Sequence, residues 1–211
     1  MNVAIIGTGK MGAGLARLLA SKGIQVTIGS RDPEKAVRLA KEIGGGAQGN
    51  GIADAVRAAN IVILAIYYQK MEEAIRAAGD LAGKILVDIS NPITDDYKGL
   101  LIGHTTSAAE EIQKLVPNAK VVKAYNTIFA ELLPAEARED RSAPVQVFVA
   151  GDDETTKKAV SDIIAKSGFD PVDSGPLSNA RLLEPLGEMN IWFGFFLGQG
   201  TSTAPAWTNA A

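Results

Sequence analysis

The 211-residue chain contains no cysteine and a single histidine, His104. Without cysteine the chain can form no disulfide, thiolate nucleophile, iron–sulfur cluster or zinc–thiolate site. One histidine likewise excludes a histidine-rich metal site, and the neighbouring carboxylates Asp95 and Asp96 have no third ligand nearby in the sequence. We therefore expect no bound metal, and we interpret His104 as a surface or helix-capping residue rather than a catalytic base.

Long hydrophobic runs and an excess of basic charge are also missing. No apolar stretch approaches the roughly 18 residues of a membrane-spanning helix. The 24 acidic and 21 basic residues give a net charge of −3, with no basic stripe for nucleic acid. The first residues lead into a predicted strand rather than into the basic and apolar segments of a signal peptide. We expect a cytoplasmic protein that binds neither nucleic acid nor membrane.

The sequence does contain a regular alternation of strand-like and helix-like segments. Near-continuous apolar strands between helices predict an α/β fold, with a doubly wound, mostly parallel Rossmann sheet covered on both faces. The glycine clusters at residues 44–46 and 49–51 are interpreted as loops. The predicted strands are residues 3–6, 24–28, 61–66, 85–89, 121–125, 145–150 and 169–172. The predicted helices are residues 12–21, 33–43, 52–59, 71–78, 107–115, 154–167 and 179–193.

A glycine-rich motif follows directly on the first predicted strand. Its residues are Gly7-Thr8-Gly9-Lys10-Met11-Gly12, a G-x-G-x-x-G spacing between a strand and a helix. Such a loop brings backbone N–H groups and a helix N-terminus close to a pyrophosphate. Gly7 permits the tight turn, Gly9 leaves room for the phosphates, and Gly12 lets the helix pack against its strand. The motif predicts a dinucleotide site.

The end of the second predicted strand indicates which dinucleotide binds. NAD-binding proteins carry an acidic residue there, whereas this chain has Ser30 and Arg31. A hydroxyl and a guanidinium suit the 2′-phosphate of NADP, and Lys35 adds a cation one helical turn later. Asp32 is the competing candidate for a ribose acid, but we interpret it as a helix N-cap because Pro33 follows it. We therefore predict NADP(H).

Three further loops follow predicted strands at the same sheet edge, where ligands bind in open parallel sheets. The amides and hydroxyl there could bond a nicotinamide carboxamide or cap the backbone, and the tyrosines could wall a ring or pack at the surface. Transfer of hydride between two cofactors needs no side-chain acid or base, so the sequence points to no particular catalytic residue. Asp88, inside a strand, is interpreted as hydrogen-bonded structure. The candidate cofactor contacts in these loops are Ile66, Tyr67, Tyr68, Asn91, Pro92, Asn126 and Thr127.

Residues 128–143 are rich in charge, alanine and proline and are interpreted as a connection. We predict an NADP-binding Rossmann domain over residues 1–127. Residues 128–211 then form the connection and a small C-terminal α/β lobe that covers the site.

Nearly the whole chain resembles the NADPH-dependent reductases of the 8-hydroxy-5-deazaflavin coenzyme, factor 420. The resemblance is carried by the glycine motif, by Gly29-Ser30-Arg31 with Lys35, and most specifically by the block Gly175-Pro176-Leu177-Ser178-Asn179-Ala180-Arg181-Leu182-Leu183-Glu184. It implies direct hydride exchange between NADP(H) and the deazaflavin. It also implies 2′-phosphate contacts at Ser30, Arg31 and Lys35, pyrophosphate contacts from Thr8 to Met11, a C-terminal roof and a homodimer.

The sequence leaves more than one candidate for the molecule that accepts the hydride. Archaeal members of this family tend to have Pro-Trp in place of Tyr67-Tyr68 and His-Thr in place of Asn126-Thr127. Tyr125-Asn126-Thr127 is closer to the Phe-Asn-Thr of membrane metalloreductases, which pass hydride from NADPH to a flavin. We therefore keep two alternatives: a flavin, quinone or ferric reductase, and a non-enzymatic NADP(H)-binding redox sensor. The C-terminal block also has a purely structural interpretation, in which Ser178 caps a helix that contains Arg181 and Glu184 three residues apart.

Overall fold

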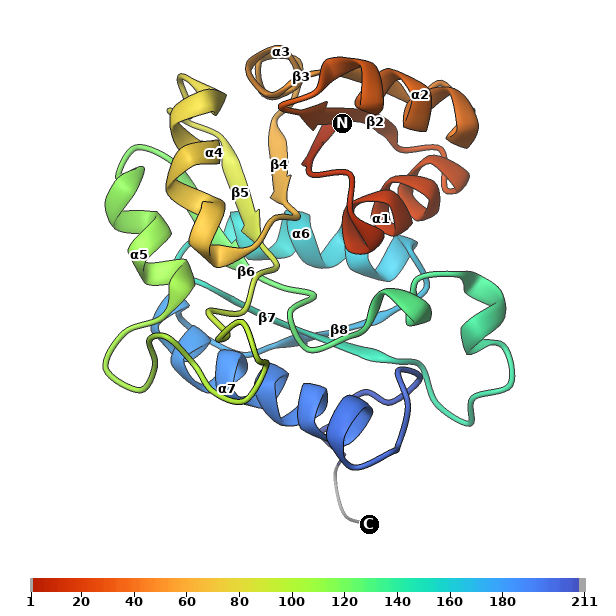
Figure 1. The fold of residues 1–211 in the computed structure, drawn as a ribbon, viewed down its shortest axis with the longest axis vertical. Helices are drawn as coiled ribbons and strands as arrows, with labels where there is room; N and C mark the ends of the chain where they lie inside the picture. The colour runs from red at the N-terminus through yellow and green to blue at the C-terminus, as the bar shows by residue number, and fades with distance from the viewer. Residues whose placement is uncertain (1, 209–211) are drawn as a thin grey trace.

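A computed structural model describes residues 2–208. Eight strands form one sheet in the order β3-β2-β1-β4-β5-β6-β7-β8 (Figure 1). Every neighbouring pair is parallel except β6 and β7, which run antiparallel. The predicted α/β class and doubly wound, mostly parallel Rossmann sheet are confirmed.

The elements follow the predicted order closely. The strands are β1 Asn2–Ile6, β2 Gln25–Ser30, β3 Gln48–Gly51, β4 Ile61–Leu64, β5 Ile85–Asp88, β6 Lys120–Lys123, β7 Gln146–Gly151 and β8 Asp170–Asp173. The α-helices are α1 Lys10–Ser21, α2 Pro33–Ile43, α3 Ile52–Arg57, α4 Met71–Ala78, α5 Ala108–Leu115, α6 Glu154–Lys166 and α7 Ala180–Ile191. The 3₁₀ turns are η1 Tyr68–Lys70, η2 Ala130–Leu132, η3 Ala135–Arg138 and η4 Leu177–Asn179, and a π-helical segment, η5 Trp192–Phe196, continues α7.

The two faces of the sheet carry separate cores. In β1, Val3 and Ile5 pack with residues of α1, α2 and α6, while Ala4 and Ile6 pack with residues of α3, α4 and α5. Successive side chains of a strand point to opposite faces, so a strand buried on both faces must be apolar throughout. This is why β1 and β4 read as unbroken hydrophobic runs.

One predicted loop is a strand. Gly49-Asn50-Gly51 lies in β3 and pairs with β2 at the sheet edge, so its interpretation as a loop was wrong. A Cβ on Gly49 would lie 2.3 Å from the backbone of Ala36 in α2. Glycine here is required by the close approach of helix and strand, and not by a turn.

The start of α2 has the geometry that the sequence predicts. The Asp32 side chain accepts a hydrogen bond from the Lys35 backbone N–H at 3.1 Å, and Pro33 is the first helical residue. The N-cap interpretation of Asp32 is confirmed, which leaves Ser30 and Arg31 at the end of β2.

The C-terminal part of the chain shares the same sheet. β7 pairs with β6, β8 pairs with β7, and α7 packs on β7 through Leu183 against Phe148 and Ala150. The division into a domain of residues 1–127 and a lobe of residues 128–211 stays a prediction. Among the described residues, no helix is long and apolar enough to cross a membrane.

Candidate functional site

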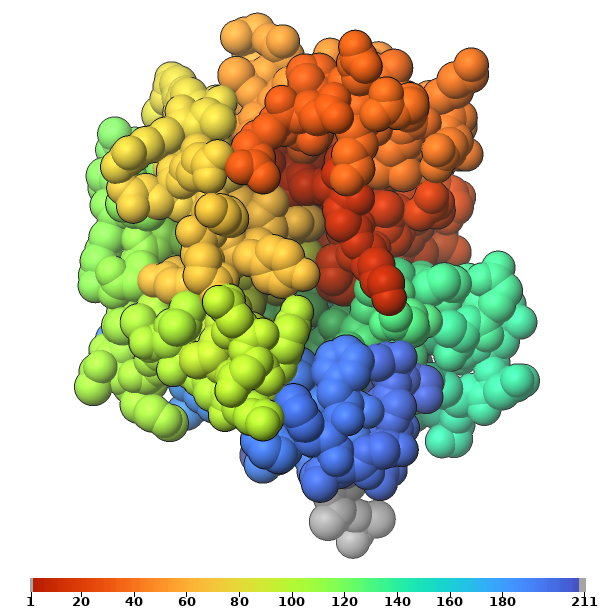
Figure 2. All heavy atoms as spheres, in the orientation of Figure 1, coloured from red at the N-terminus to blue at the C-terminus, as the bar shows by residue number. Residues whose placement is uncertain are grey.

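A cavity of about 760 Å³ opens at the carboxyl ends of the parallel strands. The strand order reverses between β1 and β4, and the loops after these two strands diverge there, which creates a crevice for a ligand. Figure 2 shows this face, where the red N-terminal segment, the yellow and green middle segments and the blue C-terminal helix surround a hollow.

The glycine loop forms one wall of this cavity. Gly7 has φ +122°, and a Cβ there would lie 2.2 Å from the carbonyl oxygen of Ala65. A Cβ on Gly12 would lie 2.2 Å from the carbonyl oxygen of Gly7. Gly9 differs, because a Cβ there would meet no atom within 4 Å. The loop is thus tightly packed against the protein at Gly7 and Gly12, whereas Gly9 borders open space on the side of the cavity.

The N-terminus of α1 is suited to an anion. Gly9 is its N-cap, no side chain caps the helix, and its first turn contains no acidic residue. The first N–H groups of a helix need acceptors, and the helix dipole makes this end partly positive. The side chain of Lys10 is exposed and reaches Glu131 at 3.4 Å. This end of the helix therefore fits a pyrophosphate.

The side chains at the end of β2 form the second charged part of the cavity. Ser30, Arg31 and Lys35 all line it. The Ser30 hydroxyl oxygen accepts the Asp32 backbone N–H at 3.1 Å. Arg31 Nη1 lies 2.8 Å from Glu73 Oε1 of α4, which also lines the cavity. The cations sit where the ribose of an adenosine bound at the glycine loop would lie.

At the other end of the cavity, α7 packs on two asparagine loops. Asn91 and Asn126 exchange two hydrogen bonds of 2.9 Å, and Asn126 Nδ2 also donates to the Leu183 carbonyl at 2.8 Å. A Cβ on Gly187 would lie 2.7 Å from the Asn91 side chain, so α7 lies directly on these loops. Asn190 Nδ2 donates to the Thr127 carbonyl at 3.2 Å.

Three successive residues in this region, Tyr125, Asn126 and Thr127, each have a buried polar atom without a partner. Asn126 is 6% exposed and Thr127 is 1% exposed, and both line the cavity. Asn126 Oδ1 and Thr127 Oγ1 make no hydrogen bond. The preceding residue, Tyr125, has φ +58°, a rare left-handed conformation for a bulky side chain. Unpartnered buried groups and backbone strain gather at binding sites, because a ligand supplies the missing contacts.

Aromatic rings line the mouth of the cavity. Phe195 of η5 packs edge-on against Tyr97 and Phe129, with centroids 6.4 Å and 5.5 Å apart. Phe195 is 59% exposed, and Tyr67 beside the cavity is 69% exposed. The rings present an open apolar wall to a planar ligand. The sequence gives no sign that Tyr97, Phe129 and Phe195 belong to the site, because hydrophobic periodicity does not reveal contacts between distant segments.

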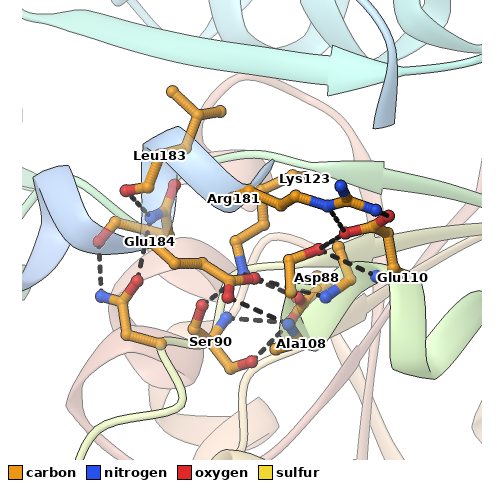
Figure 3. A network of polar contacts seen from close by, with 12 residues as sticks. Asp88, Ser90, Ala108, Glu110, Lys123, Arg181, Leu183 and Glu184 are labelled. Atoms are coloured by element: carbon orange, nitrogen blue, oxygen red, sulfur yellow. Dashed lines mark hydrogen bonds and ion pairs between the residues drawn. The ribbon is translucent and has the colours of Figure 1, made fainter. Parts of the chain in front are cut away.

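A buried ion network connects α7 to the sheet and to α5 (Figure 3). Lys123 Nζ lies 2.7 Å from Asp88 Oδ2 and 2.8 Å from Glu184 Oε1, and all three side chains have no exposed area. Glu184 also accepts the Ala108 backbone N–H at the start of α5, at 2.9 Å. The network joins β5, β6, α5 and α7 at one point. The interpretation of Asp88 as hydrogen-bonded structure agrees with these contacts.

The charges in this network shift each other's pKa. Burial alone would lower the pKa of Lys123, but Asp88 and Glu184 outweigh it and raise that pKa above its usual value. Burial raises the pKa of Glu184, helped by Asp88 and opposed by Lys123. Two carboxylates therefore share one buried cation.

The interpretation of Ser178 as a helix cap was wrong, and the spacing of Arg181 and Glu184 does not mark an ion pair. The N-cap of α7 is Asn179 and makes no side-chain cap hydrogen bond, so Ser178 is not the cap. Arg181 does not pair with Glu184. It forms a two-pronged contact of 2.6 and 2.8 Å with Glu110 of α5, while Glu184 turns to Lys123. Both charged residues tie α7 to other elements, which local spacing cannot reveal.

Most of the predicted contacts meet at this one cavity. Those that line it are Gly7, Thr8, Gly9, Lys10, Met11, Ser30, Arg31, Lys35, Ile66, Tyr67, Asn91, Asn126 and Thr127. Gly12, Tyr68 and Pro92 do not. Gly12 instead lets α1 pack closely on the glycine loop. Tyr68 is partly buried, and burial together with the Glu111 charge raises the pKa of its hydroxyl. Pro92 is buried, and its carbonyl accepts the Leu101 N–H. His104 is exposed and lies outside this cavity.

Comparison with known proteins identifies the relatives of this chain. Residues 2–92 match the family described as NADP oxidoreductase, coenzyme F420-dependent. The F420-dependent NADP reductase of Methanothermobacter marburgensis is 30% identical over 204 residues, which cover 88% of this chain and 89% of that protein. A crystal structure from Arthrobacter sp. FB24, provisionally described as an F420-dependent NADP reductase, has a TM-score of 0.87 at 32% identity. The two structures match over 99% of this chain and 100% of the Arthrobacter chain.

A second group of relatives is larger than this chain. Metalloreductase STEAP3 of Rattus norvegicus is 34% identical over 192 residues, which cover 90% of this chain but only 37% of that protein. The chain thus spans well under half the length of the metalloreductases that it matches.

Proposed function

The chain belongs to the family of coenzyme F420-dependent NADP oxidoreductases, and on that basis we propose that it transfers hydride between NADPH and a deazaflavin of the factor 420 type. Membership of this family makes the chain an NADP oxidoreductase rather than a non-enzymatic redox sensor. The proposal concerns the second coenzyme and the residues that hold both molecules.

We propose that NADPH spans the cavity from the end of β2 to α7. Its 2′-phosphate lies at Ser30, Arg31 and Lys35, and its pyrophosphate lies at the open side of Gly9, against the N-terminus of α1. Support comes from the uncapped helix end, from the empty space in front of Gly9, and from the three polar side chains that line the cavity at β2 and α2.

Asn126 and Thr127 line the cavity, each with one polar atom, Oδ1 and Oγ1, that has no partner, and this is the observation that carries the nicotinamide end of the proposal. Neither atom has exposed surface in this structure, so the proposal includes a small rotation of both side chains toward the bound ring. A carboxamide has an NH₂ group that donates and a carbonyl oxygen that accepts. The Asn126 oxygen can accept the first, and the Thr127 hydroxyl can donate to the second. The pair would hold the plane of the ring and so select the face that it turns to the acceptor.

In this arrangement the protein orients the two rings and shields them from water. NADPH supplies the hydride, and the proton that completes reduction of the acceptor comes from solvent, so no group of the protein has to gain or lose one. Asn126, Thr127 and the helix α7 fix one ring, while Phe195, Tyr97 and Tyr67 offer a wall for the second. Close, oriented contact and exclusion of water account for most of the rate that such a site can supply.

A flavin is the second candidate for the acceptor, and two observations favour it. The chain is 34% identical to a metalloreductase over 90% of its own length. Tyr67 and Asn126, which depart from the archaeal deazaflavin pattern, both line the cavity. The two candidates share the fold and NADPH, and differ only in the ring that accepts hydride.

The acceptor is tested by following NADPH oxidation at 340 nm with each acceptor in turn. We expect a rate well above background with the factor 420 deazaflavin, and slower turnover of free flavins, a quinone and ferric chelates at equal concentration. Faster turnover of a flavin would replace the first candidate by the second. No turnover of any of them would contradict the proposed hydride transfer. The homodimer and the cytoplasmic location stay predictions.

A further inference from the structure

The charges that line the cavity are unequal in number. Four cations line it, namely Lys10, Arg31, Lys35 and Lys70, and Glu73 is the only carboxylate among the described residues that do so. A positive cavity suits an anionic dinucleotide. A carboxylate in the same cavity opposes such a ligand, so the place of Glu73 requires an explanation.

The favourable position of acidic residues at a helix N-terminus does not explain why Glu73 faces the cavity, because it applies equally to Glu72. Glu72 and Glu73 both lie in the first turn of α4, where acidic side chains are favourable. Glu72 pairs with Arg76 one turn later on the same helix and does not line the cavity. Glu73 instead reaches Arg31, 42 residues away in sequence, at 2.8 Å. One of the two acids therefore pairs within its own helix, and the other pairs with a distant cation that lines the same cavity.

The partner of Glu73 is the cation at the end of β2. Arg31 is 67% exposed and Glu73 is 53% exposed, so the ion pair is weakly held and can exchange partners. An arginine that faces a phosphate ester uses the same planar fork of N–H donors that it offers to a carboxylate. A phosphate ester that binds Arg31 therefore displaces the Glu73 carboxylate from it, in whole or in part.

We propose that Glu73 is a specificity-determining residue that competes with the 2′-phosphate of NADP(H) for Arg31. The inference rests on the proposed function, since it takes Arg31 as a 2′-phosphate contact. When the phosphate arrives, Glu73 loses its cation and faces a like charge. Glu73 thereby lowers the affinity for NADP(H), has no such effect on NAD(H), and favours release of the phosphorylated product.

The test compares two single substitutions on the same turn of α4. Glu73→Gln removes the charge that faces Arg31, and Glu72→Gln removes a neighbouring charge outside the cavity. Wild type and both variants are titrated with NADPH, NADH and 2′,5′-ADP. We expect Glu73→Gln to bind NADPH and 2′,5′-ADP about three- to tenfold more tightly, the size of effect that charges close together at an exposed site produce.

The same titrations contain the controls. NADH affinity of Glu73→Gln and all affinities of Glu72→Gln should stay within about twofold of wild type. The gain for NADPH should shrink as salt is raised, because salt screens exposed charges. In an Arg31→Ala background, the gain from Glu73→Gln should be clearly smaller, because the contested cation is gone and only the repulsion between Glu73 and the phosphate remains.

Two different failures can be told apart. If wild type shows no preference for NADPH over NADH, the 2′-phosphate site itself is refuted. If wild type prefers NADPH but Glu73→Gln binds it no more tightly, or tightens NADH equally, only the competitive role of Glu73 is refuted. A weaker binding of NADPH would also overturn that role and make Glu73 a support for Arg31.

Discussion

Replacing Lys123 by methionine should lower the free energy of unfolding by about 3–5 kcal/mol, because it removes the single cation of a buried network. Asp88 and Glu184 would remain without their partner, both fully buried. Methionine keeps the apolar length of the lysine stem, so the loss reports the charge rather than a cavity. Urea unfolding with linear extrapolation measures it.

Lys158→Met is the matched control for this substitution. Lys158 pairs with Asp162 one turn later on α6, at 2.8 Å, but both side chains are mostly exposed. Its loss should cost no more than about 1 kcal/mol. Equal and small effects of the two substitutions would show that the buried network does not hold α7 on the sheet.

Replacing Gly9 by alanine should separate cofactor binding from folding. A methyl group at Gly9 meets no protein atom within 4 Å, and the φ of −75° is open to alanine. The added group occupies the space proposed for the pyrophosphate. We expect NADPH binding to weaken by about 1–3 kcal/mol, the usual cost of an extra methyl in a close contact. Stability should fall by less than about 1 kcal/mol, the cost of losing a glycine cap.

Gly51→Ala is the control for Gly9→Ala. Gly51 is also the glycine N-cap of a helix, with φ −62°, and a Cβ there would meet only Pro33, at 3.8 Å. It does not line the cavity. NADPH affinity should therefore stay within about twofold. Unchanged binding in Gly9→Ala, measured by calorimetry, would place the pyrophosphate elsewhere.

The parts of the site that lie close to a strand end could be predicted from the sequence. The glycine motif, Ser30, Arg31 and the asparagines each follow an apolar run directly. Parallel strands bring their carboxyl ends to one edge, and that rule alone gathers these residues around one cavity. The N-cap at Asp32 was equally local, since Pro33 fixes the backbone that a cap requires.

The missing parts depend on contacts between distant segments. Lys123 and Glu184 are 61 residues apart, and no local pattern shows that a lysine inside a strand will meet an acid of α7. Local spacing suggested instead that Glu184 pairs with Arg181. Phe195 and Tyr97 meet at the mouth of the cavity for the same reason. β3 was missed because glycine has a low strand propensity, and the reason for Gly49 is the close packing of α2 on this strand.

The central claim is that this cavity holds a dinucleotide through its 2′-phosphate, and calorimetric titration of the wild-type protein with NADPH and with NADH under identical conditions tests it most directly. Contacts of a charged donor contribute about 1.5–3 kcal/mol, so NADPH should bind roughly 10- to 100-fold more tightly than NADH. Equal affinities, or tighter binding of NADH, would contradict the account.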